Sequence, residues 1–99
     1  MTLDIHELID GCPKKLLYQL DDVSLQALTS AFARFESRTG LLIDPDGDLR
    51  LSSGLEPLIS AISDSMAASE GQANELCNAF LRRVVAWQRG GINIIFVGD

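Results

Sequence analysis

Three aspartates alternate along residues 44 to 48, where the sequence reads Asp-Pro-Asp-Gly-Asp. Carboxylates at positions 1, 3 and 5 of a loop are the first ligands of an EF-hand calcium site. That loop also requires glycine at position 6 and a bidentate glutamate at position 12, and these positions hold Leu49 and Leu55. The pattern fails at the two positions that define the calcium loop, so we expect no specific metal site.

The same residues are typical of a tight turn. Asp44 can accept a hydrogen bond from the backbone two residues further on, Pro45 fixes φ, and Gly47 can adopt positive φ. We therefore interpret residues 41–52 as a β-hairpin that holds the three aspartates at its tip. Weak calcium binding by the clustered carboxylates is the alternative.

Other catalytic patterns are incomplete. His6 is the only histidine, and the Glu7 that follows it would start an HExxH zinc motif whose second histidine is missing. The two cysteines, Cys12 and Cys77, form no CxxC pair and are expected to be free thiols in a reducing compartment. The sequence predicts neither an enzyme nor a cofactor, and a small enzyme built from scattered carboxylates ranks third among the functions considered.

Composition predicts one compact domain over residues 1–99. Apolar residues make up 46% of the chain and charged residues 22%, which are ordinary globular values. The longest apolar run is far shorter than the roughly 20 residues of a membrane helix. Because the N-terminus is acidic and resembles neither a secretory signal nor a transit peptide, we expect a cytoplasmic protein.

Hydrophobic periodicity predicts about five helices. Apolar residues at helical spacing indicate two short helices within residues 4–20, and a longer helix begins after Asp21 or Asp22 and ends at Gly40. Two more helices follow, one with Pro57 in its first turn and one that ends at Gly90-Gly91. The expected fold is α+β in the order ααα-ββ-αα-β.

The predicted sheet is mixed and three-stranded, and consists of the β-hairpin 41–52 plus the C-terminal strand 92–97. Following the chain direction places the last strand parallel to the first. An order of second, first and last strand would leave the apolar segment 92–97 at an edge, where it invites pairing. A homodimer through residues 92–97 is therefore one expected assembly.

The net charge of −6 points to a basic partner. Most of the negative charge lies in residues 41–75, and we expect Asp44, Asp46 and Asp48 to contact a protein partner. Trp87 and Arg83 are further partner-binding candidates, because tryptophan and arginine are enriched in interaction hot spots. The alternative for Trp87 is that it closes the core at a helix end. We do not expect direct nucleic acid binding, because the chain as a whole lacks a basic surface.

The segment FLRRVVAWQRGGINIIFVGD, a helix ended by glycine and followed by an apolar strand, loosely resembles the end of barstar-like inhibitors. The resemblance covers about a fifth of the chain, and the remainder departs from that family in order and motif. The function expected from the chain's size and acidity is a small inhibitor or immunity-type protein that blocks a basic partner enzyme. The alternative is a structural or adaptor subunit that assembles through its C-terminal strand and helix.

Overall fold

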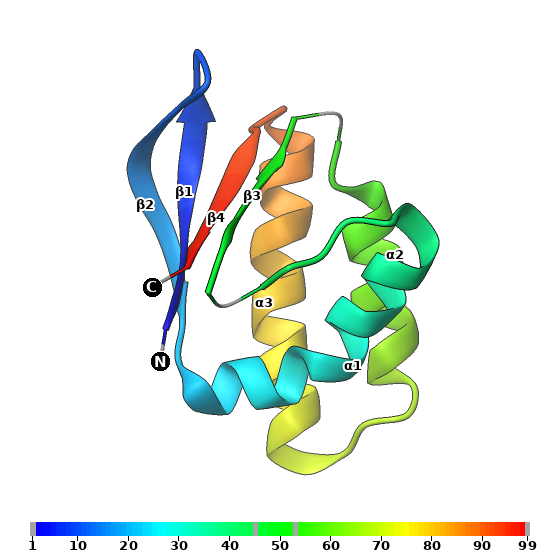
Figure 1. Ribbon diagram of the computed structural model, residues 1–99. Helices are drawn as coiled ribbons and strands as arrows, with labels where there is room; N and C mark the ends of the chain where they lie inside the picture. The colour runs from blue at the N-terminus through cyan, green and yellow to red at the C-terminus, as the bar shows by residue number, and fades with distance from the viewer. Residues whose placement is uncertain (1, 45, 53, 99) are drawn as a thin grey trace.

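The computed structural model describes residues 2–44, 46–52 and 54–98. The elements follow the order β1 (Leu3–Ile9), β2 (Cys12–Leu20), α1 (Asp22–Thr39), β3 (Asp48–Leu51), α2 (Glu56–Met66), α3 (Gly71–Arg89) and β4 (Ile94–Gly98). The strands form one antiparallel sheet in the order β2-β1-β4-β3, with the helices gathered on one face (Figure 1). The fold is a small α+β fold, but the prediction of five helices and a mixed three-stranded sheet is wrong.

Residues 4–20, which we predicted to contain two short helices, belong to the hairpin of β1 and β2. Asp10 and Gly11 make its turn, with φ angles of 53° and 78°. Positive φ at both central residues matches the twist of paired strands, and Asp-Gly is a preferred pair for such a turn. Leu3 and Ile5 alternate with polar residues and are fully buried against the helices, and a register shift between His6 and Leu8 then brings Leu8 to a buried position.

The prediction of a hairpin at residues 41–52 is also wrong. Residues 41–44 belong to no strand, and β3 pairs with β4, where Leu49 lies opposite Phe96 and Leu51 lies opposite Ile94. These pairs give β3 buried apolar partners that the segment 41–44 does not provide. β4 is consequently antiparallel to both of its neighbours and lies inside the sheet, whereas we predicted a parallel strand at its edge.

The two edge strands carry features that discourage pairing with other chains. Among the described strands β2 pairs with β1 alone, and its end next to the hairpin turn presents Pro13, Lys14 and Lys15, all exposed. Proline removes a backbone donor and lysine adds charge, and both are common at natural sheet edges. β3, the other edge, has only four residues.

The predicted ends of α1 are confirmed. Asp21 is the N-cap, and its carboxylate accepts a hydrogen bond from the Ser24 N–H at 2.9 Å. That backbone hydrogen bond holds the pKa of Asp21 below its ordinary value. At the other end Gly40 adopts the left-handed conformation, with φ of 76°, and its N–H donates to the Glu36 carbonyl oxygen.

α2 begins without a side-chain cap of its own, although Pro57 occupies its first turn as predicted. The Leu55 N–H instead donates to Oε1 of Gln88, in the last turn of α3, at 2.6 Å. A side chain from one helix thereby satisfies a backbone donor at the start of another. In the part of the chain that the structure describes, no helix has both the length and the apolarity to cross a membrane.

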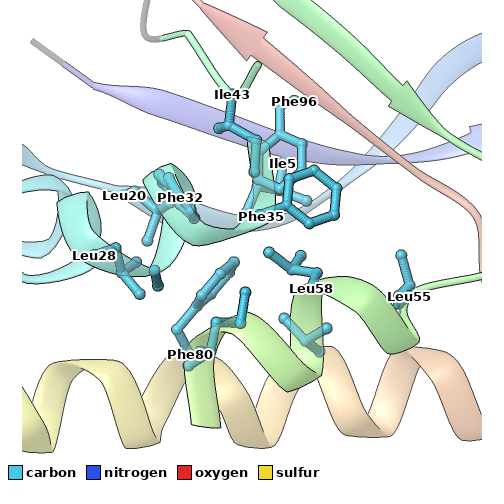
Figure 2. Packing of buried hydrophobic residues seen from close by; sticks show 14 of the residues in the cluster. Ile5, Leu20, Leu28, Phe32, Phe35, Ile43, Leu55, Leu58, Phe80 and Phe96 are labelled. Atoms are coloured by element: carbon cyan, nitrogen blue, oxygen red, sulfur yellow. The ribbon is translucent and has the colours of Figure 1, made fainter. Parts of the chain in front are cut away.

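The core lies between the sheet and the helices, as Figure 2 shows. Phe80 of α3 is fully buried near its centre. Its ring centroid lies 5.6 Å from that of Tyr18 on β2, 6.4 Å from that of Phe32 on α1 and 6.2 Å from that of Trp87. These contacts between aromatic rings therefore connect α1 and α3 to β2, an edge strand of the sheet.

The two thiols should differ sharply in reactivity. Cys77 is fully buried, its Sγ lies 3.2 Å from the Ala27 carbonyl oxygen, and burial raises the pKa of its thiol, whereas Cys12 is exposed beside the hairpin turn. We expect a disulfide reagent such as DTNB to modify one thiol rapidly in the native protein and the other only after unfolding. Cys12→Ser should remove the fast phase, and two fast thiols in the parent protein would contradict this burial.

Gly11→Ala tests the hairpin. The substitution should lower the free energy of unfolding by about 1–2 kcal/mol, because alanine is strained at positive φ although no atom would crowd its Cβ. Gly47→Ala is the matched control: Gly47 lies outside the left-handed region, and a Cβ there would be 3.7 Å from the nearest Asp44 atoms. Urea denaturation measures both, and equal losses would argue against the assigned turn.

Candidate functional site

Asp44 organises a turn through its side chain and its backbone. Its Oδ1 accepts a hydrogen bond from the Asp46 N–H at 2.8 Å, and its carbonyl oxygen accepts one from the Gly47 N–H at 3.0 Å. The predicted turn is present, but it leads from a coil into β3 and does not join two paired strands. The prediction of positive φ at Gly47 is wrong. Pro45 lies outside the described residues.

The three aspartates do not converge on one point. Oδ1 of Asp48 lies 3.3 Å from the Gly98 nitrogen, which donates at 2.9 Å to the Gly47 carbonyl oxygen as well. Within residues 2–44, 46–52 and 54–98, no three His, Cys, Asp or Glu side chains are arranged to hold a metal ion. The side chains of Asp46 and Asp48 are exposed, so both present negative charge to solvent.

Trp87 and Arg83 are placed apart from the aspartates. Trp87 is only 6% exposed and packs edge-on against Phe80, so it has little surface to offer a partner. The Arg83 guanidinium lies 5.6 Å from the ring centroid of Tyr18, on the edge strand β2. Asp48 belongs to β3, at the opposite edge of the sheet. The five residues singled out from the sequence therefore do not form a single site.

A groove of about 620 Å³ runs along α1 and is bounded on its other side by residues 42 and 43. We call it the α1 groove. Its volume is within the range of about 300–1,000 Å³ that is common for ligand-binding pockets. The lining residues are Asp22, Leu25, Gln26, Thr29, Phe32, Ala33, Glu36, Leu42 and Ile43.

The α1 groove combines an apolar interior with acidic ends. Phe32 and Ile43 are buried at 9% and 4% exposure, whereas Leu42 is 57% exposed. Its charged lining residues are Asp22 and Glu36, near the two ends of α1, and no lysine, arginine or histidine is among the described residues that line it. Asp44 follows Ile43 directly in the chain, so the acidic turn adjoins the groove.

Sequence reasoning missed the α1 groove because it assigned residues 41–43 to a strand. Leu41 and Leu42 were placed in the first strand of the predicted hairpin 41–52, yet they lie outside the sheet and are 39% and 57% exposed. The pattern on α1 gave no signal for the groove, because Leu25, Leu28, Phe32 and Phe35 lie 3, 4 and 3 residues apart, as expected of a single core-facing side.

The face of the sheet opposite the helices is a second exposed region (Figure 1). One row across it pairs Leu16, His6, Ile95 and Arg50, in the order of the strands. His6 is oriented within this row, because its Nδ1 lies 3.1 Å from the Lys14 carbonyl oxygen. Leu16 and Arg50 at the two ends of the row are exposed, whereas Ile95 is only 2% exposed.

The burial of Trp87 can be measured directly, because it is the only tryptophan. Its fluorescence in the native protein should be blue-shifted and poorly quenched by acrylamide relative to the unfolded chain, since 6% of its surface is exposed. Phe80→Leu should increase quenching by loosening the ring contact. Quenching in the native state equal to that in denaturant would contradict the placement of Trp87 in the core.

Comparison of the chain with protein-family models, with curated proteins and with solved structures finds no match. Its function therefore has to be argued from the groove, the charges and the exposed surfaces described above.

Proposed function

We propose that this protein is a non-enzymatic protein-binding module, a small acidic inhibitor or immunity-type protein that blocks a basic partner enzyme. The observation that carries the proposal is the α1 groove, whose apolar interior adjoins the aspartates of the 44–48 turn. Apolar contact area and exposed carboxylates on one surface suit a partner that offers apolar and basic side chains together.

The charge distribution supports the same proposal. The chain has 14 acidic and 8 basic residues, and residues 41–75 hold seven of those acids and a single base, Arg50. Residues Asp46 and Asp48 are exposed within this stretch. A local negative field of this kind attracts a basic partner and accelerates its association at low ionic strength.

An adaptor that assembles through the C-terminal strand is less well supported. β4 is paired with β1 on one side and with β3 on the other. Its backbone therefore has no free edge for pairing with a second copy through residues 92–97. Because Trp87 of the preceding helix is buried as well, neither feature that motivated the adaptor function offers an accessible surface.

The proposal predicts binding that depends on salt and on the 44–48 carboxylates. We expect the wild-type protein, used as bait in lysate from the native host, to capture a partner. The triple variant Asp44→Asn, Asp46→Asn and Asp48→Asn should capture less of that partner, and capture by the wild-type bait should weaken between about 50 and about 300 mM salt. Asparagine keeps the hydrogen-bond acceptor of each aspartate, so the turn should persist. Quantitative mass spectrometry of the captured proteins provides the measurement.

A control variant changes the same amount of charge elsewhere. Asp10→Asn, Glu70→Gln and Glu75→Gln remove three exposed carboxylates that lie outside the 44–48 turn and the α1 groove. This control should retain the partner. If both triple variants lose it equally, net charge is responsible and the turn is not a binding site. A partner captured equally well at all salt concentrations would remove the electrostatic basis of the proposal.

A further inference from the structure

We infer that the α1 groove binds one basic, amphipathic α-helix of the partner protein. The inference rests on the proposed function and adds to it the part of the partner that is recognised. It follows from three properties of the groove: its length, the secondary structure of its walls and the sign of its charges.

The length of the groove matches a short helix. Its lining residues on α1 extend from Asp22 to Glu36, fourteen residues along the helix. At a rise of about 1.5 Å per residue, this distance is about 21 Å, or about four turns of a partner helix lying alongside α1. Leu25, Phe32 and Ala33 lie between the two acidic ends, where an apolar stripe of the partner would be seated.

The walls of the groove favour a helix over an extended peptide. An extended peptide gains affinity by adding to a free strand edge, and neither α1 nor residues 42–43 is a strand. A helix satisfies its own backbone hydrogen bonds, so it can be bound by side chains alone. The exposed Leu42 and the buried Phe32 and Ile43 provide such side chains on both walls.

The charges define the polar side chains of the occupant. Glu36 lies at one end of the groove, Asp44 adjoins Ile43, and none of the described lining residues is cationic. Lysine or arginine beside the apolar stripe of the partner would meet these carboxylates, whereas an acidic helix or a fatty acid would be repelled.

The test uses a synthetic peptide of about 15 residues, which forms about four helical turns. Leucines placed at i, i+3, i+7 and i+10 give it one apolar stripe, and lysines occupy the remaining faces. A twin peptide replaces every lysine with glutamate, and a scrambled peptide has the same composition without the stripe. Binding is followed by fluorescence anisotropy of the labelled peptide and by ¹H–¹⁵N chemical-shift mapping.

Two matched protein variants locate the binding. Ala33→Lys places a cation in the groove, and Ala79→Lys makes the same change at an exposed position of α3 outside it. We expect the basic peptide to bind, with shifts confined to α1 and residues 41–46. Ala33→Lys should weaken this binding by about tenfold or more and Ala79→Lys by less than about twofold. The acidic and scrambled peptides should not bind.

Several results would overturn the inference. These are equal weakening by both lysine variants, equal binding of the acidic or scrambled peptide, shifts centred on the outer face of the sheet, and no binding of the basic peptide at millimolar protein. Circular dichroism of both variants checks that each has retained its fold.

The proposed function does not depend on a helix in the α1 groove, and capture of the partner from lysate tests the two proposals separately. A partner that Ala33→Lys retains and the 44–48 asparagine variant loses would refute the groove while supporting the acidic binding module. A partner retained by both would refute both.

Discussion

The ring of Phe80 connects the layers of this fold. It contacts Tyr18 on the outermost strand, Phe32 on α1 and Trp87 two turns further along α3, so one side chain sets the spacing of two helices and a sheet edge. Phe32 in turn meets Phe96 of β4, at a centroid distance of 6.3 Å. Because interiors are close-packed, these contacts determine how α1 can lie on the sheet. The position of α1 then determines where the remaining surface is hollow.

The α1 groove follows from that placement. α1 turns Leu28, Ala31 and Phe35 fully into the core, while a neighbouring strip of the same helix is left for residues 42–43 to cover. Two residues cannot cover four helical turns, and a hollow remains. On its other side α1 is held to α2 by Arg38, which donates to Asp64 and Ser60. An exposed pair of this kind contributes only about 0–1 kcal/mol, so packing in the core accounts for most of the docking of α1.

The sequence was most informative where local chemistry determines structure. Asp21 and Gly40 mark the two ends of α1, because a carboxylate caps a helix start and glycine accepts the left-handed conformation. Neither effect depends on distant residues. The prediction of helices within residues 4–20 was wrong because a few apolar residues in so short a segment fit both a helical and a strand period. Asp10-Gly11 was the local signal that separates the two, and it favours a hairpin.

Strand pairing and the candidate site depended on contacts that no local pattern contains. Nothing within residues 41–52 indicates that Leu49 will face Phe96, more than forty residues away, in place of the nearby apolar segment. The α1 groove was missed for the same reason, since its second wall consists of residues that this pairing leaves outside the sheet. The acidic turn was recognised from local chemistry, but its position beside an apolar hollow was not.

The place of β4 within the sheet has a consequence for how the chain assembles during synthesis. Of the four strands, β4 is made last, and it is the one that joins the β1–β2 hairpin to β3. Until it emerges from the ribosome, β1 and β3 each have an unpaired edge, and β3 cannot join the β1–β2 hairpin in one sheet. The sheet is therefore completed only after the other three strands and the three helices have been translated, and a nascent chain paused before β4 would be the species most open to aggregation and to chaperones.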